Sequence, residues 1–209
     1  MSPRARRILS RRSLARPSTD VARDLLGTLL VRDSPDGRVV VRLVETEAYR
    51  QDDPGSHAFH GYTPRLEAMF GRPGLAYVYF TYGMHWCLNV SCEAEGVGAA
   101  VLLRAAAVVE GIETIRKRRG DAAPERDLVR GPARLTVALG VDRALYGVDL
   151  VDPASPLRLE DDGWRPPPDD VVTGPRVGVL DTRPWRWSMA SAPEVSRYTP
   201  HARARRPVT

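Results

Sequence analysis

The residues best suited to chemistry lie between positions 45 and 104. Glu45 and Glu47 stand two apart in VETEAY, Tyr49 follows them, and an apolar run ends on Arg104. A carboxylate held at the end of a strand can take a proton from a water molecule and orient that water for attack. The alternative for Glu47 is an ordinary surface glutamate, since glutamates are seldom buried without a partner.

Two polar residues interrupt apolar strands in this region. Arg104 ends the run VLLR, and Asn89 stands within CLNVS. A buried guanidinium needs a carboxylate, a phosphate or an ordered water, and a buried amide needs hydrogen bonds. An ion pair between Arg104 and Glu47 would serve either a structural or a functional role.

Tyrosines supply flat surfaces beside these groups. Tyr77 and Tyr79 share one face of a strand, because side chains alternate with a period of two, while Tyr82 stands in a turn beside Gly83. Filling the core is the simpler interpretation of Tyr77. A tyrosine at a tight turn could instead stack on a base or enter a base step.

Histidine, cysteine and aspartate leave a metal site open as an alternative. The candidate ligands are His57, His60, His85, Asp52, Asp53, Cys87 and Cys92. A Cys-x4-Cys spacing in a strand hairpin suits zinc poorly, so we expect neither a metal nor a cofactor. We favour a neutral His57 that hydrogen-bonds to a ligand or stacks on it.

The elements that position these residues follow from periodicity and from helix-stop and turn residues. Helices are expected from residues 17–20 to Gly27, and over 65–69, 109–119 and 131–140. Strands are expected over 28–32, 38–47, 75–80, 84–90 and 99–108. Residues 52–61 read as a loop. This strand-rich order with scattered helices predicts one α+β domain.

Length and composition set outer limits. A chain of 209 residues, 43% of them hydrophobic, can bury the core of a single domain. No apolar run approaches the ~20 residues needed to span a membrane, and the beginning lacks the apolar segment of a secretory signal. Two cysteines make no disulfide framework, which favours a reducing, cytoplasmic setting.

The net charge of +5 comes from the two ends. Residues 1–16 carry six arginines and 197–209 carry four, without acids, so 17–196 hold 21 basic and 26 acidic groups, a net charge of −5. We expect a basic, partly flexible segment at 1–16, one domain at 17–196 and a basic tail at 197–209. Such ends suit a phosphate-bearing partner, although 30 of the 31 basic residues are arginine, which also fits codon bias.

Several motifs, in this order, resemble the alkyladenine (3-methyladenine) DNA glycosylase family. They are VETEAY, the His57 loop, TPR, MFG-x-PG, YVY-x-x-YGM-x-x-C-x-N and VLLRA. The similarity begins near residue 22 and continues through RGPARLTVALG and GPRVGV, so it covers most of the chain. Each motif alone is weak, but their order and spacing together are specific. The resemblance implies a curved antiparallel β-sheet flanked by helices.

The activity that the resemblance implies is monofunctional excision of alkylated purines from duplex DNA, in base excision repair. The target nucleotide would be flipped into a pocket, since its glycosidic bond is inaccessible inside the stack. Glu47 matches the general base that activates the attacking water, and Arg104 matches the arginine that helps to hold this water and the acid. The protein would act as a monomer, in the cytoplasm, associated with the nucleoid through DNA.

The resemblance also implies the residues that bind the base and the DNA. The pocket residues would be Tyr49, His57, Tyr79 and Asn89, the amide of the last obstructing the amino group of guanine. The DNA contacts would be the wedge Tyr82, its neighbour Met84, and Arg134 near a phosphate. The sequence departs from the family at His85-Trp86 and around Arg130 and Ala133.

Two other classes of function remain open at this stage. One is a catalytically silent nucleic-acid-binding module whose aromatic residues only stack. Stacking needs neither Glu47 nor Arg104. The other is a metal-dependent hydrolase built on His57, His60 and Asp52 or Asp53.

Overall fold

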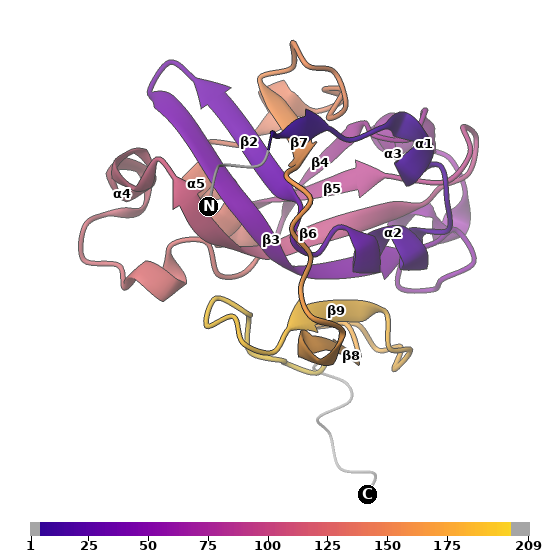
Figure 1. Cartoon of the computed structure of the whole chain (residues 1–209). Coiled ribbons are helices and arrows are strands. Elements are labelled where there is room, and N and C mark those ends of the chain that lie inside the picture. Colours follow the sequence, from indigo (N-terminus) through magenta and orange to yellow (C-terminus); the bar gives the residue numbers. More distant parts are fainter. Residues whose placement is uncertain (1–4, 202–209) are drawn as a thin grey trace, which may run out of the picture.

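The computed structural model of the chain describes residues 5–201, and its strands form one antiparallel sheet (Figure 1). The strands are β1 (Arg7–Ile8), β2 (Leu29–Ser34), β3 (Gly37–Tyr49), β4 (Ala76–Thr81), β5 (His85–Ser91), β6 (Ala100–Glu110), β7 (Leu157–Asp161), β8 (Val171–Gly174) and β9 (Arg186–Met189). Their order is β1-β7-β2-β3-β6-β5-β4, and β9 pairs with both β3 and β8. The expected curved antiparallel sheet in a single α+β domain is confirmed.

The long central strand β3 sets the curvature of the sheet. Its first half, residues 37–44, is rich in valine and leucine, apolar residues that suit a strand paired on both sides, here with β2 and β6. The register between β3 and β6 shifts at Val40/Val41, Leu43/Glu45 and Glu45/Thr46. Each such irregularity bends and twists a strand. The glutamates of VETEAY therefore stand where the sheet bends.

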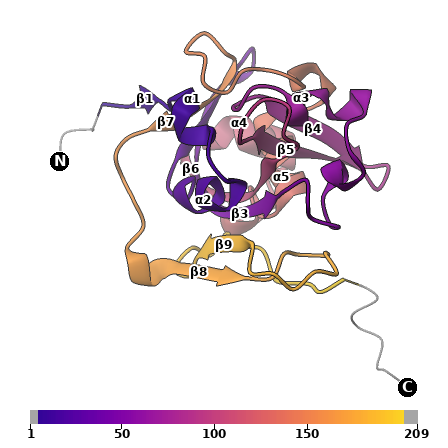
Figure 2. The same cartoon turned by 90° about the vertical axis from the view of Figure 1, so that its right-hand side faces the viewer.

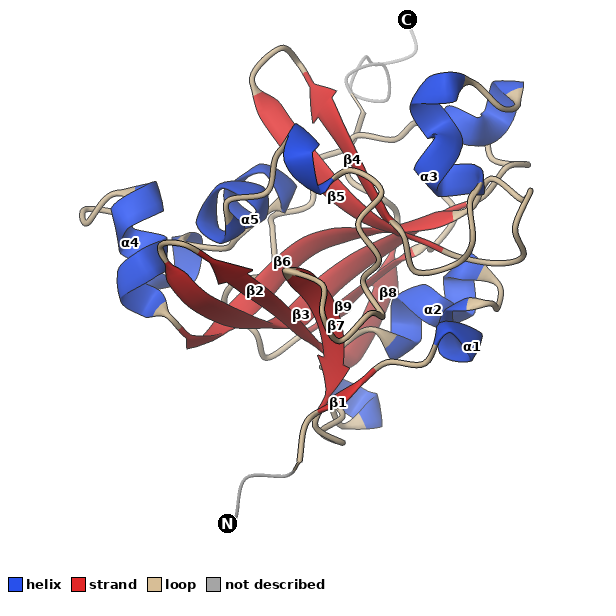
Figure 3. Ribbon diagram, turned by 90° about the horizontal axis from the view of Figure 1, so that it is seen from above, coloured by secondary structure: helices blue, strands red, loops and turns tan. Residues whose placement is uncertain are grey.

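Short helices flank this sheet (Figure 3). They are α1 (Arg11–Leu14), α2 (Ser18–Asp24), α3 (Glu67–Phe70), α4 (Ile112–Arg119) and α5 (Pro132–Leu139), with 3-10 turns at His57–His60, Pro64–Leu66, Glu125–Asp127, Arg143–Leu145 and Pro168–Asp170. The main core lies among α2, α5 and the middle strands. A smaller cluster joins α3 to β4 around Met69 and Tyr77.

The helix expected from Val109 begins later, at Ile112, because β6 continues to Glu110. Gly111 fixes this boundary. It has φ +83, and an added Cβ would lie 2.2 Å from the carbonyl oxygen of Arg38 on β3. Only glycine fits such a close approach at positive φ. The prediction missed it because Val109 and Glu110 fit the helix pattern as well.

Part of the expected basic segment 1–16 packs on the domain. Within it β1 pairs with β7, and α1 buries Leu14 in the main core. A count of charges alone did not reveal Leu14 as an apolar anchor, because arginines dominate this segment. At the other end, residues 202–209 of the predicted basic tail lie outside the described residues.

The ribbon of β8 and β9 lies along one side of the domain and joins the end of β3 (Figure 2). Glu45, Thr46 and Glu47 pair with Ser188, Trp187 and Arg186 of β9. The late part of the chain thus covers the strand that carries the two glutamates. Among residues 5–201, no helix combines the length and apolar character that crossing a bilayer requires.

Candidate active site

The two glutamates of β3 share one arginine. Arg104 of β6 donates from Nε to Glu45 Oε1 at 3.0 Å, and its Nη1 lies 3.3 Å from Glu47 Oε2. Ser196 donates its amide and hydroxyl to the two oxygens of Glu45, at 2.8 Å each, and Arg186 adds a bond of 2.8 Å. Glu45 is therefore fully occupied as a structural anchor of Arg104.

Glu47 is less heavily bonded, and it lies directly beneath a cavity. Its side chain is 0% exposed. Its Oε1 accepts the amide of Val177 at 2.7 Å, and its Oε2 accepts the hydroxyl of Tyr49 at 2.9 Å. Arg104 and Tyr49 line the cavity, whereas Glu47 reaches it only through them.

The cavity above Glu47 has a volume of about 490 Å³ and aromatic walls. Tyr77 and Tyr79 are stacked with their centroids 5.5 Å apart, and His57 meets Tyr79 edge-on at 4.6 Å. The sequence-predicted residues that line it are Tyr49, His57, Tyr79, Tyr82, Asn89 and Arg104. The structure thus brings together most of the expected set around one space that suits a flat ligand.

Burial and charge set the protonation of these walls. Burial lowers the pKa of Arg104, but the carboxylates of Glu47 and Glu45 outweigh this effect and raise it above its usual value. Burial, followed by the charge of Glu47, raises the pKa of Tyr49 well above its usual value. Burial likewise raises the pKa of Tyr79. The cavity therefore presents a permanent cation and neutral phenols.

His57 has an exposed outer edge, but its ring lies against the tyrosines. Its Nδ1 and the Tyr77 hydroxyl share a hydrogen bond of 2.8 Å. Burial, and then the charge of Arg65, lowers the pKa of His57 below 6.5. The imidazole is thus neutral at neutral pH, as expected from the sequence.

This lowered value gives a testable pH dependence. We expect an NMR titration of the imidazole to place the pKa of His57 below 6.5. Since the unfolded chain then binds the proton more readily, this group should reduce the free energy of unfolding as the pH falls through 6.5. His57→Gln should remove that part of the dependence. A titration midpoint above 6.5 would contradict the expectation.

The remaining predicted residues surround the cavity mouth. Asn89 is buried and donates from Nδ2 to the Tyr77 carbonyl oxygen at 3.0 Å, which orients its amide in the wall. Tyr82 is 88% exposed with φ 51, at the tip of the hairpin between β4 and β5, and Met84 beside it is 66% exposed. Arg134 lies in the first turn of α5, next to lining residues, and pairs with Asp127 at 3.3 Å. Positive φ strains a tyrosine, and such strain clusters at functional sites.

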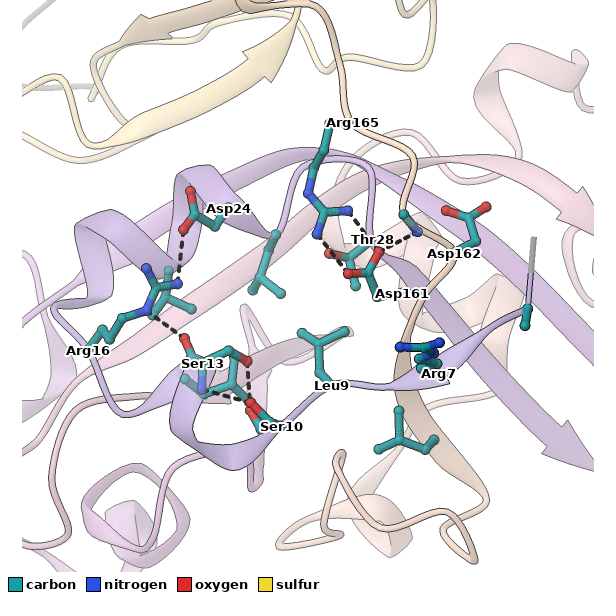
Figure 4. Close-up of a pocket in the computed structure, with 16 residues that line it drawn as sticks. Arg7, Leu9, Ser10, Ser13, Arg16, Asp24, Thr28, Asp161, Asp162 and Arg165 are labelled. Atoms are coloured by element: carbon teal, nitrogen blue, oxygen red, sulfur yellow. Dashed lines mark hydrogen bonds and ion pairs between the residues drawn. The ribbon is translucent and has the colours of Figure 1, made fainter.

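A second cavity, of about 750 Å³, lies at the β1–β7 edge of the sheet (Figure 4). Four of its charged lining residues are paired with one another, Arg16 with Asp24 at 2.9 Å and Arg165 with Asp161 at 2.7 Å. None of its described lining residues is aromatic or histidine. Although it is the larger space, it offers no surface on which a flat ligand could stack.

The comparison with known proteins agrees with a cavity that suits a flat ligand. A family model described as methylpurine-DNA glycosylase (MPG) matches residues 12–193. The chain belongs to this family. It is therefore a DNA glycosylase, a hydrolase that acts on DNA.

Relatives named "Putative 3-methyladenine DNA glycosylase" match the glycosylase over nearly its whole length. The protein of Streptomyces avermitilis is 50% identical over 203 residues, 95% of each chain. That of Burkholderia lata is 46% identical over 185 residues, 87% of each chain, and that of Nocardia farcinica is 46% identical over 192 residues, 88% of each. The family resemblance inferred from the motifs is confirmed.

The proposed metal ligands have other partners in this glycosylase. Asp53 is 0% exposed and binds two arginines, Arg176 and Arg183, while His57 is bonded to Tyr77. Among residues 5–201, no three His, Cys, Asp or Glu side chains converge as metal ligands would. The arrangement therefore gives a metal-dependent hydrolase no support.

Sequence reasoning missed the residues that complete the site from the late part of the chain. Val177 and Ser196 contact the glutamates from 130 and 151 positions away. The motif GPRVGV contributed to the family resemblance, but it gave no role for the Val177 amide. Ser196 had no signal at all, because a serine in a loop is common.

Proposed function

We propose that this glycosylase excises alkylated purines, such as 3-methyladenine, from duplex DNA without cutting the strand itself. The observation that carries this proposal is a buried, arginine-paired glutamate beneath a cavity with aromatic walls, beside an exposed tyrosine at a hairpin tip. The printed names of the relatives support the class of substrate. Neither the buried acid nor its arginine would serve a protein that only stacks on DNA.

Base flipping would bring the purine into this cavity, because the glycosidic bond cannot be reached inside a stacked duplex. Tyr82 would fill the space that the nucleotide leaves, with Met84 beside it, and Arg134 would contact a phosphate. Tyr49 and Tyr79 would face the base, since a cationic ring is attracted to π surfaces. His57 would hydrogen-bond to one edge. Asn89 would exclude undamaged guanine by obstructing its amino group.

The chemical step would use Glu47 as the general base. A water molecule held by Glu47 and Arg104 could attack C1′ of the sugar. A C1′–O bond forms, the bond from C1′ to the purine nitrogen breaks with both electrons going to the base, and the water's proton goes to Glu47. The positive charge of an alkylated purine makes it the easier leaving group. The products are a free base and an abasic site.

A base-release panel on defined duplexes tests this proposal directly. The duplexes would carry 3-methyladenine, 7-methylguanine, hypoxanthine or ethenoadenine, with undamaged DNA as the control. We expect release of at least one damaged purine, no release of normal guanine, and an abasic strand that stays intact until alkali is added. Absence of release from every lesion, or direct strand cleavage by the enzyme, would contradict the proposal. Sedimentation with and without duplex would test the expected monomer.

A further inference from the structure

A cluster of two arginines and two aspartates, of which Arg176 and Asp53 are buried, lies next to the cavity. The side chains of Arg176 and Asp53 are both 0% exposed, and the two arms of the guanidinium bond both carboxylate oxygens. Arg183 donates to the same carboxylate at 3.0 Å and also to Asp181. Two positive and two negative charges balance here. None of the four residues lies within a helix or strand, so this cluster fixes loops.

The cluster joins three segments that surround the cavity. Arg176 Nη1 donates to the carbonyl oxygen of Ala48 at 3.0 Å, and its guanidinium carbon lies 4.6 Å from the ring centroid of Tyr49. Tyr49 lines the cavity and Arg176 does not, so the cation supports the tyrosine from behind. At Gly55, an added Cβ would lie 2.7 Å from Val179 Cγ1 and 3.2 Å from Arg176 Nη2. The loops therefore pack without room for one more carbon.

The position of Arg176 fixes the peptide that contacts Glu47. The amide of Val177 belongs to the planar peptide unit between Arg176 and Val177. This amide donates to Glu47 Oε1 at 2.7 Å. Anchoring the arginine side chain on Asp53 therefore holds an amide donor against the proposed general base. The same anchor holds the ring of Tyr49, whose hydroxyl meets the other oxygen of Glu47.

Stability alone explains this arrangement poorly. A buried ion pair is often no more stabilising than apolar side chains of the same volume. Here the arginine also carries an unsatisfied donor, since its buried Nε has no hydrogen-bond partner. The benefit of this ion pair is geometric. A planar guanidinium that bonds both oxygens of a carboxylate fixes an orientation that apolar packing does not.

We propose that Arg176 is a positioning residue, which through its fork on Asp53 holds the Val177 amide and the Tyr49 ring against Glu47. This inference rests on the proposed function. Arg176→Lys keeps the charge, but a single ammonium cannot bond two carboxylate oxygens and the Ala48 carbonyl in the same geometry. Because a misplacement of about 1 Å can cost on the order of 10²-fold in rate, we expect a loss of about tenfold or more.

The experiment measures single-turnover base release with enzyme in excess, using the lesion duplex from which the unaltered enzyme releases the base fastest. Affinity is measured separately, by gel shift on a duplex with a tetrahydrofuran abasic analogue. The variants are Arg176→Lys, Asp53→Asn and their double, with folding followed by circular dichroism. Arg158→Lys is the matched control, since Arg158 is a buried arginine with two carboxylate partners, Asp33 and Glu160, away from the cavity.

We expect each single variant to lower the rate constant about tenfold or more while affinity stays within about threefold. The double variant should lose little more than either single one, because the two residues act as a unit. The control should keep the rate of the unaltered enzyme. Asp53→Asn, which preserves shape, keeps the test valid if Arg176→Lys fails to fold.

Three results would overturn the positioning role. They are an unchanged rate constant in the folded variants, an equal loss of rate and affinity, and an equal loss in Arg158→Lys. The last result would mean that any damaged buried ion pair slows the enzyme. If the unaltered enzyme releases no base at all, the proposed function fails instead, so the two failures are distinguishable.

Discussion

Glu47→Gln is expected to slow base release severely while sparing DNA binding. Glutamine keeps the size of the side chain; its oxygen can still accept the Val177 amide and its NH2 group can donate to the Tyr49 hydroxyl oxygen, but it cannot take a proton from water. General base catalysis typically contributes on the order of 10² to 10⁴-fold, and we expect a loss in that range. Single-turnover release from a lesion duplex measures the loss, and a gel shift measures binding.

The fold should survive this substitution, because Arg104 keeps its bond to Glu45. Glu160→Gln is the matched control, since Glu160 is also a buried strand glutamate paired with an arginine. It should leave both release and binding unchanged. Undiminished release by Glu47→Gln would remove Glu47 from the mechanism and would leave the water without an identified base.

Tyr82→Ala is expected to weaken binding to lesion-containing duplex by about tenfold to a hundredfold. Stacking on a base contributes about 1–3 kcal/mol, and this ring is the most exposed large hydrophobic side chain described at the cavity mouth. Excision from a single strand should change by less than about threefold, since no duplex hole needs filling there. Binding and single-turnover release on matched duplex and single-stranded lesions measure the difference.

Tyr82→Phe is the control for this second prediction. It keeps the ring and loses only the hydroxyl, so it should bind the lesion duplex nearly as well as tyrosine does. Equal losses on duplex and single-stranded substrates in Tyr82→Ala would count against a wedge. Tyr82 has φ 51, a backbone conformation that tyrosine, phenylalanine and alanine all disfavour. The two variants therefore keep a similar backbone strain at this position.

The sequence was most informative where chemistry and periodicity coincide. The strand expected over residues 38–47 is present, and both of its glutamates, Glu45 and Glu47, contact Arg104. The prediction paired Arg104 with Glu47, whereas the shorter contact is to Glu45. Bulges on both sides of Glu45 shift its register against β6, the strand that carries Arg104. Their positions depend on the pairing partner and leave no local pattern.

Contacts between loops far apart in the chain could not be predicted from the sequence for the same reason. The ion pair between Asp53 and Arg176 joins residues 123 positions apart. Both lie in segments that lack helical or strand periodicity. Read from the sequence, Asp53 was a candidate metal ligand, since an aspartate near histidines is equally consistent with that role. Only the meeting of the two loops reveals that an arginine occupies its carboxylate.

The bonds from Ser196 to Glu45 have a consequence for how the enzyme comes into being. Translation completes β2 to β6 well before residues 176–196 are made, so a nascent chain can pair its sheet while both acids still lack their amide donors. The site should therefore be completed only after the strands that carry the two acids have been made. Cleavage of the loop between β9 and Ser196 would detach the two Ser196 donors of Glu45, while every described strand of the sheet stays on the other fragment.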